Sequence, residues 1–330
     1  MPDIALILTV ALSLVFAYLN GYNDSGANIA PLVASRAMGR RPALLLAAVA
    51  ELIGPFLFGV AVAQTVGRSV VRTDLITPVQ LNIAIATAIG WGLLAGQLRI
   101  PTSATHALLG GMVGAAFAGV GVAALDLAGI ARIVAFLVAT PIVGLVLGHV
   151  TLNLLLLVVQ GMPPHANRYL RWGEIGFSMG LSLVHGANNA QTSMGLITLG
   201  LVLTGVQVGF VVPEWTVAIC ALALALGVAV SSQRIMWRLG GHLYRIRPIH
   251  GFASTGASFA TLLVATRAGA PVSGTQIVSA TLAGAGAAQR LSMVRWTVVQ
   301  SIVVAWVITF PATAIAAAVL VWLVQLFRQP

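Results

Sequence analysis

The sequence predicts an all-α, polytopic membrane protein built from two homologous halves. Three observations favour this fold class: an apolar composition, a series of long hydrophobic runs, and two polar motifs that each occur twice in the same order. Of the 330 residues, 59% are hydrophobic and only 7% are charged, whereas a soluble domain carries about 25% charged residues. A chain this apolar cannot cover a water-exposed surface, which excludes a soluble globular fold.

The hydrophobic runs are long enough to cross a bilayer, because about 20 apolar residues span the hydrocarbon core. Only helices and closed barrels satisfy the backbone in lipid, so we expect about ten to twelve membrane elements, nearly all helical. The runs fall roughly at 4–20, 24–38, 42–66, 79–97, 103–124, 129–160, 174–184, 190–212, 215–231, 252–268, 272–288 and 294–327.

A polar stretch near the middle divides the chain. Residues 161–172 contain Pro163, Pro164 and two arginines, and we expect them to form a connecting loop. The first membrane repeat is therefore expected at 1–160 and the second at 173–330. Asp3 stands where a basic n-region would begin a signal peptide, so a cleaved leader is not expected.

The basic residues indicate orientation rather than nucleic-acid binding. The net charge is +10, and all 17 basic residues are arginines that lie mostly in short gaps between apolar runs. There is no stripe of mixed aromatic and basic residues, so no nucleic-acid partner is expected. The most basic gap is 233–250, which the positive-inside rule places in the cytoplasm. We expect a multi-pass protein of the cell (plasma) membrane.

Two polar motifs recur at nearly the same separation. The stretch Gly21–Asn28 (GYNDSGAN) returns in the second half as Gly186–Ser193 (GANNAQTS). The stretch Pro101–Gly110 (PTSATHALLG) returns as Pro271–Ala280 (PVSGTQIVSA). Each copy interrupts a hydrophobic segment. Paired, interrupted segments in two halves indicate a transporter site near the middle of the bilayer.

The proline-containing pair predicts an anion site. A proline is well tolerated in the first turn of a helix, and hydroxyls follow it in both copies at Ser103, Thr105, Ser273 and Thr275. The free N–H groups and positive dipole of a helix start favour an anion, so two facing starts would hold one tetrahedral oxyanion from two sides. The alternative is that these hydroxyls bond back to their own helices.

The asparagine-rich pair predicts a site for Na⁺ or H⁺. Its glycines allow local unwinding that exposes carbonyl oxygens, and hard oxygen ligands of this kind suit Na⁺, while a carboxylate suits Na⁺ or H⁺. The alternative is a polar network that joins helices. The polar side chains in question are Asn23, Asp24 and Asn28 in the first half and Asn188, Asn189 and Gln191 in the second.

Two further ionisable residues stand inside apolar runs. Glu51 is the second acid in such a context; it either relays a proton or closes a gate, or it is a structural partner of an arginine. His106 directly follows the first hydroxyl motif, where it either donates to an anion and titrates near neutral pH or simply packs.

These motifs resemble those of the inorganic phosphate transporter (PiT) family, the bacterial relatives of the sodium/phosphate symporters. Gly21–Asn28 is similar to the family's first-half motif, Leu183–Gln191 to its second-half counterpart, and the two hydroxyl stretches to its paired helical hairpins. The resemblance covers nearly the whole chain. It implies two inverted-topology repeats with broken helices and re-entrant hairpins, a homodimer, and symport of phosphate with Na⁺ or H⁺.

Carried over position by position, the resemblance also implies roles for individual residues. Asp24, Ser103, Thr105, Gln191, Ser273 and Thr275 are expected to contact the anion. Asn23, Asp24, Asn28, Asn188 and Asn189 are expected to form a Na⁺ site, while Glu51 and His106 are expected to act in proton transfer or gating.

The second half departs from the family pattern by losing ionisable groups. Asn189 stands where the family usually has Asp, Thr192 where it often has Lys, and Gly274 and Gln276 replace a hydroxyl residue and a His. With one carboxylate fewer in a site where uncompensated charge is costly, we expect fewer coupling cations. Sulfate has no proton to donate, so a carboxylate repels it without a compensating hydrogen bond. Replacing that carboxylate by Asn189 therefore makes sulfate a more acceptable substrate.

The function expected from the sequence is secondary active import of inorganic phosphate by symport with Na⁺ or H⁺, with alternating access around a midplane anion site. The alternatives are a sulfate or other oxyanion permease of the same fold and, more remotely, an anion channel. An enzyme is not expected, because the six histidines show no metal-ligand spacing and no nucleophile elbow occurs. No cofactor is expected, and the single cysteine, Cys220, excludes an intramolecular disulfide.

Overall fold

The structure, a computed structural model, describes residues 4–98, 102–161, 163, 166–231 and 243–327. Within these residues it contains twelve α-helices and two short 3₁₀ turns, and the one β-type pairing is an isolated bridge between Val71 and Leu125. The all-α fold class predicted from the sequence is confirmed.

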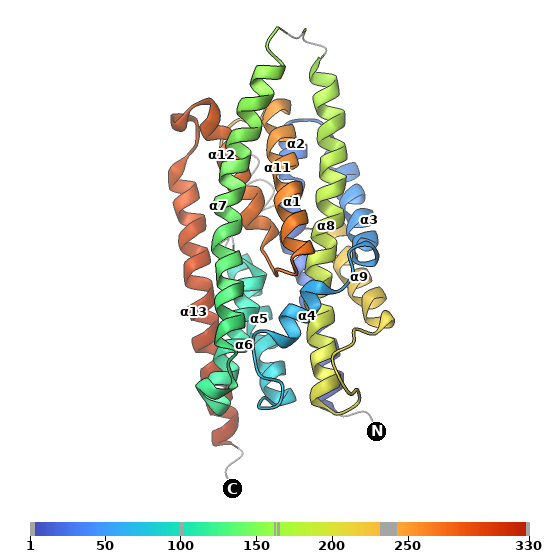
Figure 1. The fold of residues 1–330 in the computed structure, drawn as a ribbon, viewed down its shortest axis with the longest axis vertical. Coiled ribbons are helices and arrows are strands. Elements are labelled where there is room, and N and C mark those ends of the chain that lie inside the picture. Colours follow the sequence, from blue (N-terminus) through green and yellow to red (C-terminus); the bar gives the residue numbers. More distant parts are fainter. Residues whose placement is uncertain (1–3, 99–101, 162, 164–165, 232–242, 328–330) are drawn as a thin grey trace.

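The helices fall into two sets along the chain, and Figure 1 shows both termini at the same end of the molecule. The first set is α1 (Ile4–Asn28), α2 (Ala30–Ala34), α3 (Arg40–Leu57), α4 (Ala61–Arg68), α5 (Pro78–Leu98), α6 (Ala104–Val120) and α7 (Leu127–Val158). The second set is α8 (Ala166–Leu203), α9 (Glu214–Ala229), α11 (Pro248–Arg267), α12 (Gly274–Gln289) and α13 (Trp296–Leu326).

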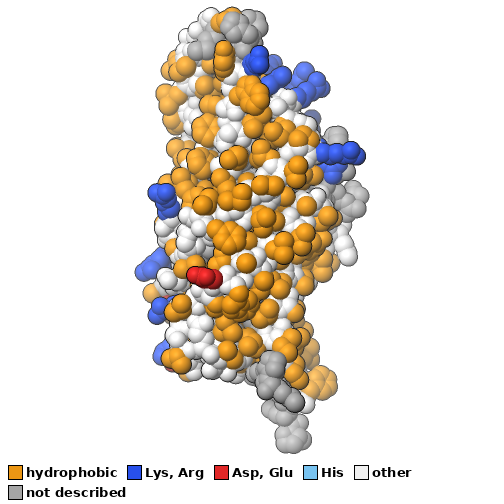
Figure 2. Space-filling view, turned by 90° about the vertical axis from the view of Figure 1, so that its right-hand side faces the viewer, with side chains coloured by type: hydrophobic (Ala, Val, Ile, Leu, Met, Phe, Trp, Pro, Cys, Tyr) orange, Lys and Arg blue, Asp and Glu red, His pale blue; other side chains and the backbone are white. Residues whose placement is uncertain are grey.

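Several helices are built to cross a membrane. Among the described residues, α1, α5, α7 and α13 are each long and apolar enough to span a bilayer. Helices α3 and α4 are apolar enough only as a pair, and the pair is bent by 77°, as in a broken span or a re-entrant loop. Large apolar side chains along α7 and α13 point outward, and Figure 2 shows a mostly hydrophobic face with basic side chains at its margins. The chain is a polytopic membrane protein.

The two sets of helices pack as repeats of each other. Helix α6 packs on α13, and α12 packs on α7. The first contact depends on Gly114, where a Cβ atom would overlap the carbonyl oxygen of Ala314, and the second on Gly284, where it would overlap that of Leu145. Because small residues let membrane helices approach closely, matched glycines preserve the same interface in both halves.

A second pair of interfaces repeats in the same way. A Cβ at Gly54 in α3 would overlap the carbonyl oxygen of Leu183 in α8, and a Cβ at Gly227 in α9 would overlap that of Tyr18 in α1. Each of these contacts joins one half to the other. In Figure 1 α7 runs away from the termini and α13 runs back toward them, so the halves have opposite directions and interleave.

The structure corrects two expectations about the second half. Residues 166–172 belong to α8, so the connecting loop expected at 161–172 is shorter. Helix α8 then runs without a break for 38 residues, joining the runs expected at 174–184 and 190–212. Gly186 does not unwind the helix; a Cβ there would press on the backbone of Glu51, so this glycine serves close packing against α3.

In the first half the break comes later than expected. Helix α1 continues through Gly21 to Asn28, and the chain turns at Ile29 before α2 begins. Gly21, like Gly186, lies at a close helix contact, where a Cβ would overlap the carbonyl oxygen of Leu224. The carbonyl oxygens expected from unwinding at this glycine therefore remain in the helix.

Two helical hairpins fill the centre from opposite ends. Helices α5 and α6 pack together in the half of the molecule nearer the termini, and α11 and α12 pack together in the other half. The returning arms, α6 with 17 residues and α12 with 16, are shorter than the roughly 20 residues needed to cross the hydrocarbon core. Both hairpins therefore enter the membrane and return to the same side. Pro101 of the first motif lies outside the described residues.

Candidate functional site

The starts of α6 and α12 meet inside the molecule. The Thr105 hydroxyl donates to the carbonyl oxygen of Val272 over 3.5 Å, and the Nε2 atoms of His106 and Gln276 lie 3.5 Å apart. His106 and Gln276 occupy matching positions in the two motifs. The structure thus brings together two stretches that lie far apart in the sequence, with their helix starts facing each other.

The N-termini of α6 and α12 are capped differently. The Ser103 hydroxyl oxygen accepts from the backbone N–H of His106 over 3.3 Å and caps α6. Ser273 makes no such cap; its hydroxyl lies 2.9 Å from the hydroxyl of Thr275. The interpretation that these hydroxyls serve their own helices therefore applies to Ser103, whereas the Ser273–Thr275 pair stands at an uncapped helix start.

Asn188 on α8 holds the tip of the second hairpin. Its amide nitrogen donates to the Thr266 hydroxyl and to the carbonyl oxygen of Ala270, both over 3.0 Å. Its amide oxygen accepts from the backbone N–H of Val272 over 3.4 Å. This side chain, expected at a cation site, is engaged on both ends by the hairpin.

Gln191, one turn further along α8, joins that helix to the bend between α3 and α4. Its amide oxygen accepts from the backbone N–H of Val62 over 2.9 Å, next to the start of α4. Its amide nitrogen is buried and has no partner within the described residues. One end of this side chain is structural, and the other offers a donor to a ligand.

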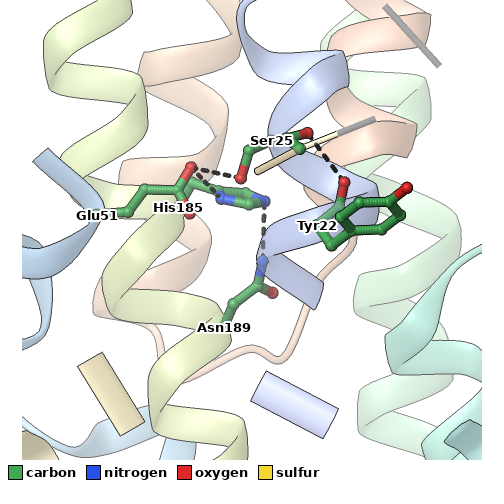
Figure 3. Close-up of polar contacts among 6 residues, drawn as sticks. Tyr22, Ser25, Glu51, His185 and Asn189 are labelled. Atoms are coloured by element: carbon green, nitrogen blue, oxygen red, sulfur yellow. Dashed lines mark hydrogen bonds and ion pairs between the residues drawn. The ribbon is translucent and has the colours of Figure 1, made fainter. Parts of the chain in front are cut away.

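A buried acid–imidazole pair links three helices (Figure 3). The Ser25 hydroxyl of α1 donates to Glu51 Oε1 of α3 over 3.0 Å. Nδ1 of His185, on α8, lies 3.1 Å from the same oxygen, close enough for an ion pair. His185 Nε2 lies 2.8 Å from the amide nitrogen of Asn189. The sequence offered an arginine as one alternative partner of Glu51, but in the structure the partner is His185.

His185 is the member of the site that sequence reasoning missed. It directly precedes Gly186 of the second asparagine motif and is fully buried, but a single histidine within a helix carries no ligand spacing. The available signal was the repeat, because the residue lies beside a motif that occurs twice. Only the packing of α8 on α3 shows that it faces Glu51.

Asp24 and Asn28 complete the polar cluster from the end of α1. Asp24 is 5% exposed and interacts electrostatically with His185 and Glu51. Both amide atoms of Asn28 are buried without a partner in the described part of the chain. Asn23, by contrast, is only half-buried, and none of the described contacts is a hydrogen bond of its side chain.

Gly274 brings the second hairpin onto this cluster. A Cβ at this position would collide with the ring of His185 and would lie 3.5 Å from Asn28 Oδ1. The absence of a side chain at Gly274 therefore allows the start of α12 to touch both residues. The hairpin tips, the end of α1 and the middle of α8 form one continuous polar region.

Among the described residues, this region contains several buried polar atoms without a partner. Nearly all buried polar atoms in native proteins are hydrogen-bonded, so such a set indicates a place for a polar ligand or ion. The described residues contain no group of three or more His, Cys, Asp and Glu side chains suited to a metal ion. The unpaired atoms of this region include Asn28 Oδ1 and Nδ2, Glu51 Oε2, His106 Nδ1, Gln191 Nε2 and Gln276 Oε1.

Interleaved helical halves, re-entrant hairpins and a buried polar centre define a membrane transport protein. Comparison with known families identifies which one. The model of the phosphate transporter family matches twice, at residues 20–162 and 157–317, which follows the two halves of the fold. The chain belongs to the phosphate transporter family, and the resemblance drawn from the motifs is confirmed.

Individual relatives agree with this assignment. The chain is 35% identical over 314 residues to a probable low-affinity inorganic phosphate transporter of Rhizobium meliloti, covering 94% of this chain and 93% of the relative. It is 32% identical over 324 residues to a protein of the same description from Bacillus subtilis, covering 96% and 97%. A solved structure described as the sodium-dependent phosphate transporter shares the fold, with a TM-score of 0.88, 23% identity and coverage of 98% and 100%.

Proposed function

We propose that this protein imports inorganic phosphate by secondary active symport with a cation, using alternating access around the central polar region. The observation that carries the proposal is the meeting of the two hairpin tips, Thr105 with Val272 and His106 with Gln276, beside the buried Asp24. The family and the descriptions of the relatives support phosphate as the substrate.

The anion would be held by donors from both halves. The starts of α6 and α12 supply N–H groups and a positive dipole, and the hydroxyls of Thr105, Ser273 and Thr275 add donors, with Ser103 completing the first tip. The unpaired amide nitrogen of Gln191 adds another donor. Phosphate that keeps a proton can donate to Asp24, whereas sulfate at neutral pH has no proton to donate. This difference favours phosphate over sulfate at the site.

The coupling ion that the geometry supports best is a proton. A carboxylate and an imidazole that lie 3.1 Å apart, both buried, can share one proton between them, and Asp24 interacts with the same pair. Because the second half has Asn189 in place of a carboxylate, the site needs fewer compensating cations than one with two such acids. We propose that one proton per phosphate moves through Glu51 and His185, with His106 assisting at the hairpin tip.

Sodium is the alternative coupling ion. Hard oxygen ligands suit this ion, and the amide oxygen of Asn28 is unpaired. The same motif adds Asn23 and Asp24, and the second motif adds Asn189. Asn188 contributes to such a site indirectly, because its side chain is occupied by the hairpin.

Several further properties belong to this proposal. The two hairpins would open in turn, each toward its own end of the molecule, as the first repeat and the second repeat, which begins with α8 at Ala166, move against each other. The arginine-rich end would face the cytoplasm of the cell membrane; of the basic gap 233–250, residues 233–242 lie outside the described residues. The protein would act as a homodimer and would catalyse no chemical reaction.

The test is uptake into proteoliposomes of labelled phosphate and labelled sulfate, with imposed H⁺ or Na⁺ gradients. We expect saturable phosphate uptake driven by H⁺, little sulfate uptake, and loss of phosphate uptake in Asp24→Asn. In Glu51→Gln the H⁺ gradient should no longer accelerate uptake, while counterflow exchange of phosphate should persist.

The other outcomes would change the proposal in defined ways. Sulfate uptake without phosphate uptake would make the protein a sulfate permease. A requirement for Na⁺ in the wild type, with Glu51→Gln behaving normally, would replace the proton by sodium. Non-saturable flux that follows the membrane potential alone would indicate a channel.

A further inference from the structure

A strongly basic pocket lies at the end of the molecule opposite the termini, away from the central polar region. Its volume is about 600 Å³, and half of its ten lining residues are arginines. They come from four separate segments: the turn after α2, the first turns of α8, the stretch before α11, and the residue before α13. The arginines are Arg36, Arg171, Arg245, Arg247 and Arg295.

Carboxylates balance little of the positive charge of this pocket. The ion pairs found among the described residues are Arg72 with Asp74 and His185 with Glu51, so none of the five arginines forms one. Glu174 is fully buried behind the lining, where its carboxylate accepts a hydrogen bond from the Ser35 hydroxyl, at 2.8 Å and 3.0 Å from its two oxygens. It also interacts electrostatically with Arg171. Like charges gathered in one pocket repel each other, and a bound anion relieves that repulsion.

The walls of the pocket are fixed before any ligand arrives. Arg36 has a φ angle of +61°, the one positive φ of a non-glycine residue in the described chain, a conformation that costs about 1 kcal/mol or more in such residues. The backbone N–H of Arg295 donates to Leu243 over 3.2 Å, and the Tyr244 hydroxyl donates to Leu282 of α12 over 3.0 Å. A pre-organised pocket loses less entropy when it binds.

The chemistry of the lining identifies the class of ligand. Arginine presents a planar fork of donors that matches phosphate oxygens, and it stays charged at all physiological pH values. Five such groups exceed the charge of one inorganic phosphate, and 600 Å³ lies within the range of pockets for larger small molecules, about 300–1,000 Å³. We propose that this pocket binds a ligand that carries two or more phosphate groups.

The level of the pocket leaves two sources for such a ligand. Trp172 and Trp296 directly follow Arg171 and Arg295 and are 64% and 39% exposed. Tryptophans gather at the level of the lipid headgroups, where basic pockets meet anionic phospholipids. The same level is open to soluble oligophosphates, so the shared chemistry is a pair of neighbouring phosphate groups.

The experiment measures binding rather than transport, and its result does not depend on the proposed function. Protein in nanodiscs of zwitterionic lipid is titrated with tripolyphosphate by calorimetry, in saturating inorganic phosphate so that the central site is occupied. In parallel, the protein is purified from membranes that contain cardiolipin, a lipid with two phosphates, and the retained lipid is measured by native mass spectrometry.

The pocket variant is Arg245→Gln/Arg247→Gln, and the matched control is Arg72→Gln/Arg132→Gln, which removes the same charge from exposed positions near the other end. We expect the pocket variant to weaken tripolyphosphate binding or cardiolipin retention at least about tenfold, as loss of two charge-assisted contacts implies. The control should change either quantity less than about twofold.

A further variant, Arg36→Gly, tests the pocket with a change that should not disturb folding. Glycine adopts positive φ without strain, so this change removes one charge while easing the backbone, and it should still weaken binding measurably. Tripolyphosphate binding that depends on the pocket indicates a soluble ligand, and cardiolipin retention that depends on it indicates a lipid. Equal behaviour of the wild type, Arg36→Gly, the pocket variant and the control in both arms would overturn the proposal.

Discussion

The first half of the chain places ionisable side chains around the central site, whereas the matching positions of the second half are neutral. Asp24 corresponds to Asn189, and His106 corresponds to Gln276. Both members of each pair lie in the same polar region, and His106 and Gln276 are 3.5 Å apart. The neutral members of these two pairs still make hydrogen bonds, so at these two positions the second half has lost charge without losing polarity. The ionisable group that the second half contributes to the site is His185.

Helix packing extends this comparison to Glu51. Gly186 packs closely against the backbone of Glu51 in α3, and Gly21, the matching glycine, packs closely against the backbone of Leu224 in α9. Glu51 precedes Gly54 by the same number of positions as Leu224 precedes Gly227. Leu224 is therefore the counterpart of Glu51, and the second half has no carboxylate there.

The comparison teaches that fold and chemistry have separate requirements in a repeat protein. Close helix contacts are needed in both halves, because each half packs on the other, and the glycines are kept in both. A carboxylate is needed in one half only, because the two halves share one site and each extra buried charge is costly without compensation. The repeats are symmetric where they pack and asymmetric where they carry charge.

The largest effect is expected at the paired glycines. Gly54→Ala and Gly227→Ala both push a Cβ into a carbonyl oxygen of the facing helix, and each should destabilise the protein by about 3 kcal/mol or more, or prevent folding. Gly92→Ala, whose Cβ meets nothing within 4 Å, should be neutral or slightly stabilising. Thermal unfolding in detergent measures all three, and a large difference between Gly54→Ala and Gly227→Ala would break the structural symmetry.

The next effect concerns the position of the carboxylate. Asp24→Asn should lower phosphate uptake by up to about 100-fold, since a hydrogen bond to a charged group contributes up to about 3 kcal/mol. Combining it with Asn189→Asp restores the charge in the other half, but against His185, which lies 2.8 Å from the Asn189 amide. We expect uptake to stay low, and full recovery would show that the two halves are interchangeable.

A smaller effect is expected where the second half is structural. Asn188→Ala removes two donated hydrogen bonds, to Thr266 and Ala270, and one accepted from the backbone N–H of Val272. It should lower the free energy of unfolding by about 2 kcal/mol or more. Asn189→Ala removes one contact, to His185, and should cost about half as much. If the order were reversed in a thermal unfolding assay, Asn188 would not be the residue that holds the hairpin.

The smallest effect separates the two helix starts. Ser103→Ala removes the cap of α6 and should destabilise the protein by about 1 kcal/mol. Ser273→Ala removes no cap and leaves the Thr275 hydroxyl without its neighbour. It should therefore cost less stability than Ser103→Ala but should raise the KM for phosphate. The unfolding temperature and the KM of both variants are measured. An equal loss of stability in the two variants would contradict the distinction between the helix starts.

Much of this architecture was predictable because it follows from composition and repetition. The apolar runs require membrane helices, and two motifs repeated at nearly the same separation require two halves and a shared site. The unwinding expected at Gly21 and Gly186 was wrong, because a glycine signals either a flexible backbone or a close contact. The sequence of one helix does not show which, since the answer lies on the neighbouring helix.

By itself, therefore, the sequence determined the class of protein, the repeat, and nearly all polar residues of the centre, because these depend on residue type and spacing along the chain. Only the tertiary structure decided which of them touch. It paired Glu51 with His185, assigned Asn188 to the hairpin, and gathered five arginines from four segments into one pocket. Such contacts join residues far apart in the chain, and they are set by how the two halves interleave.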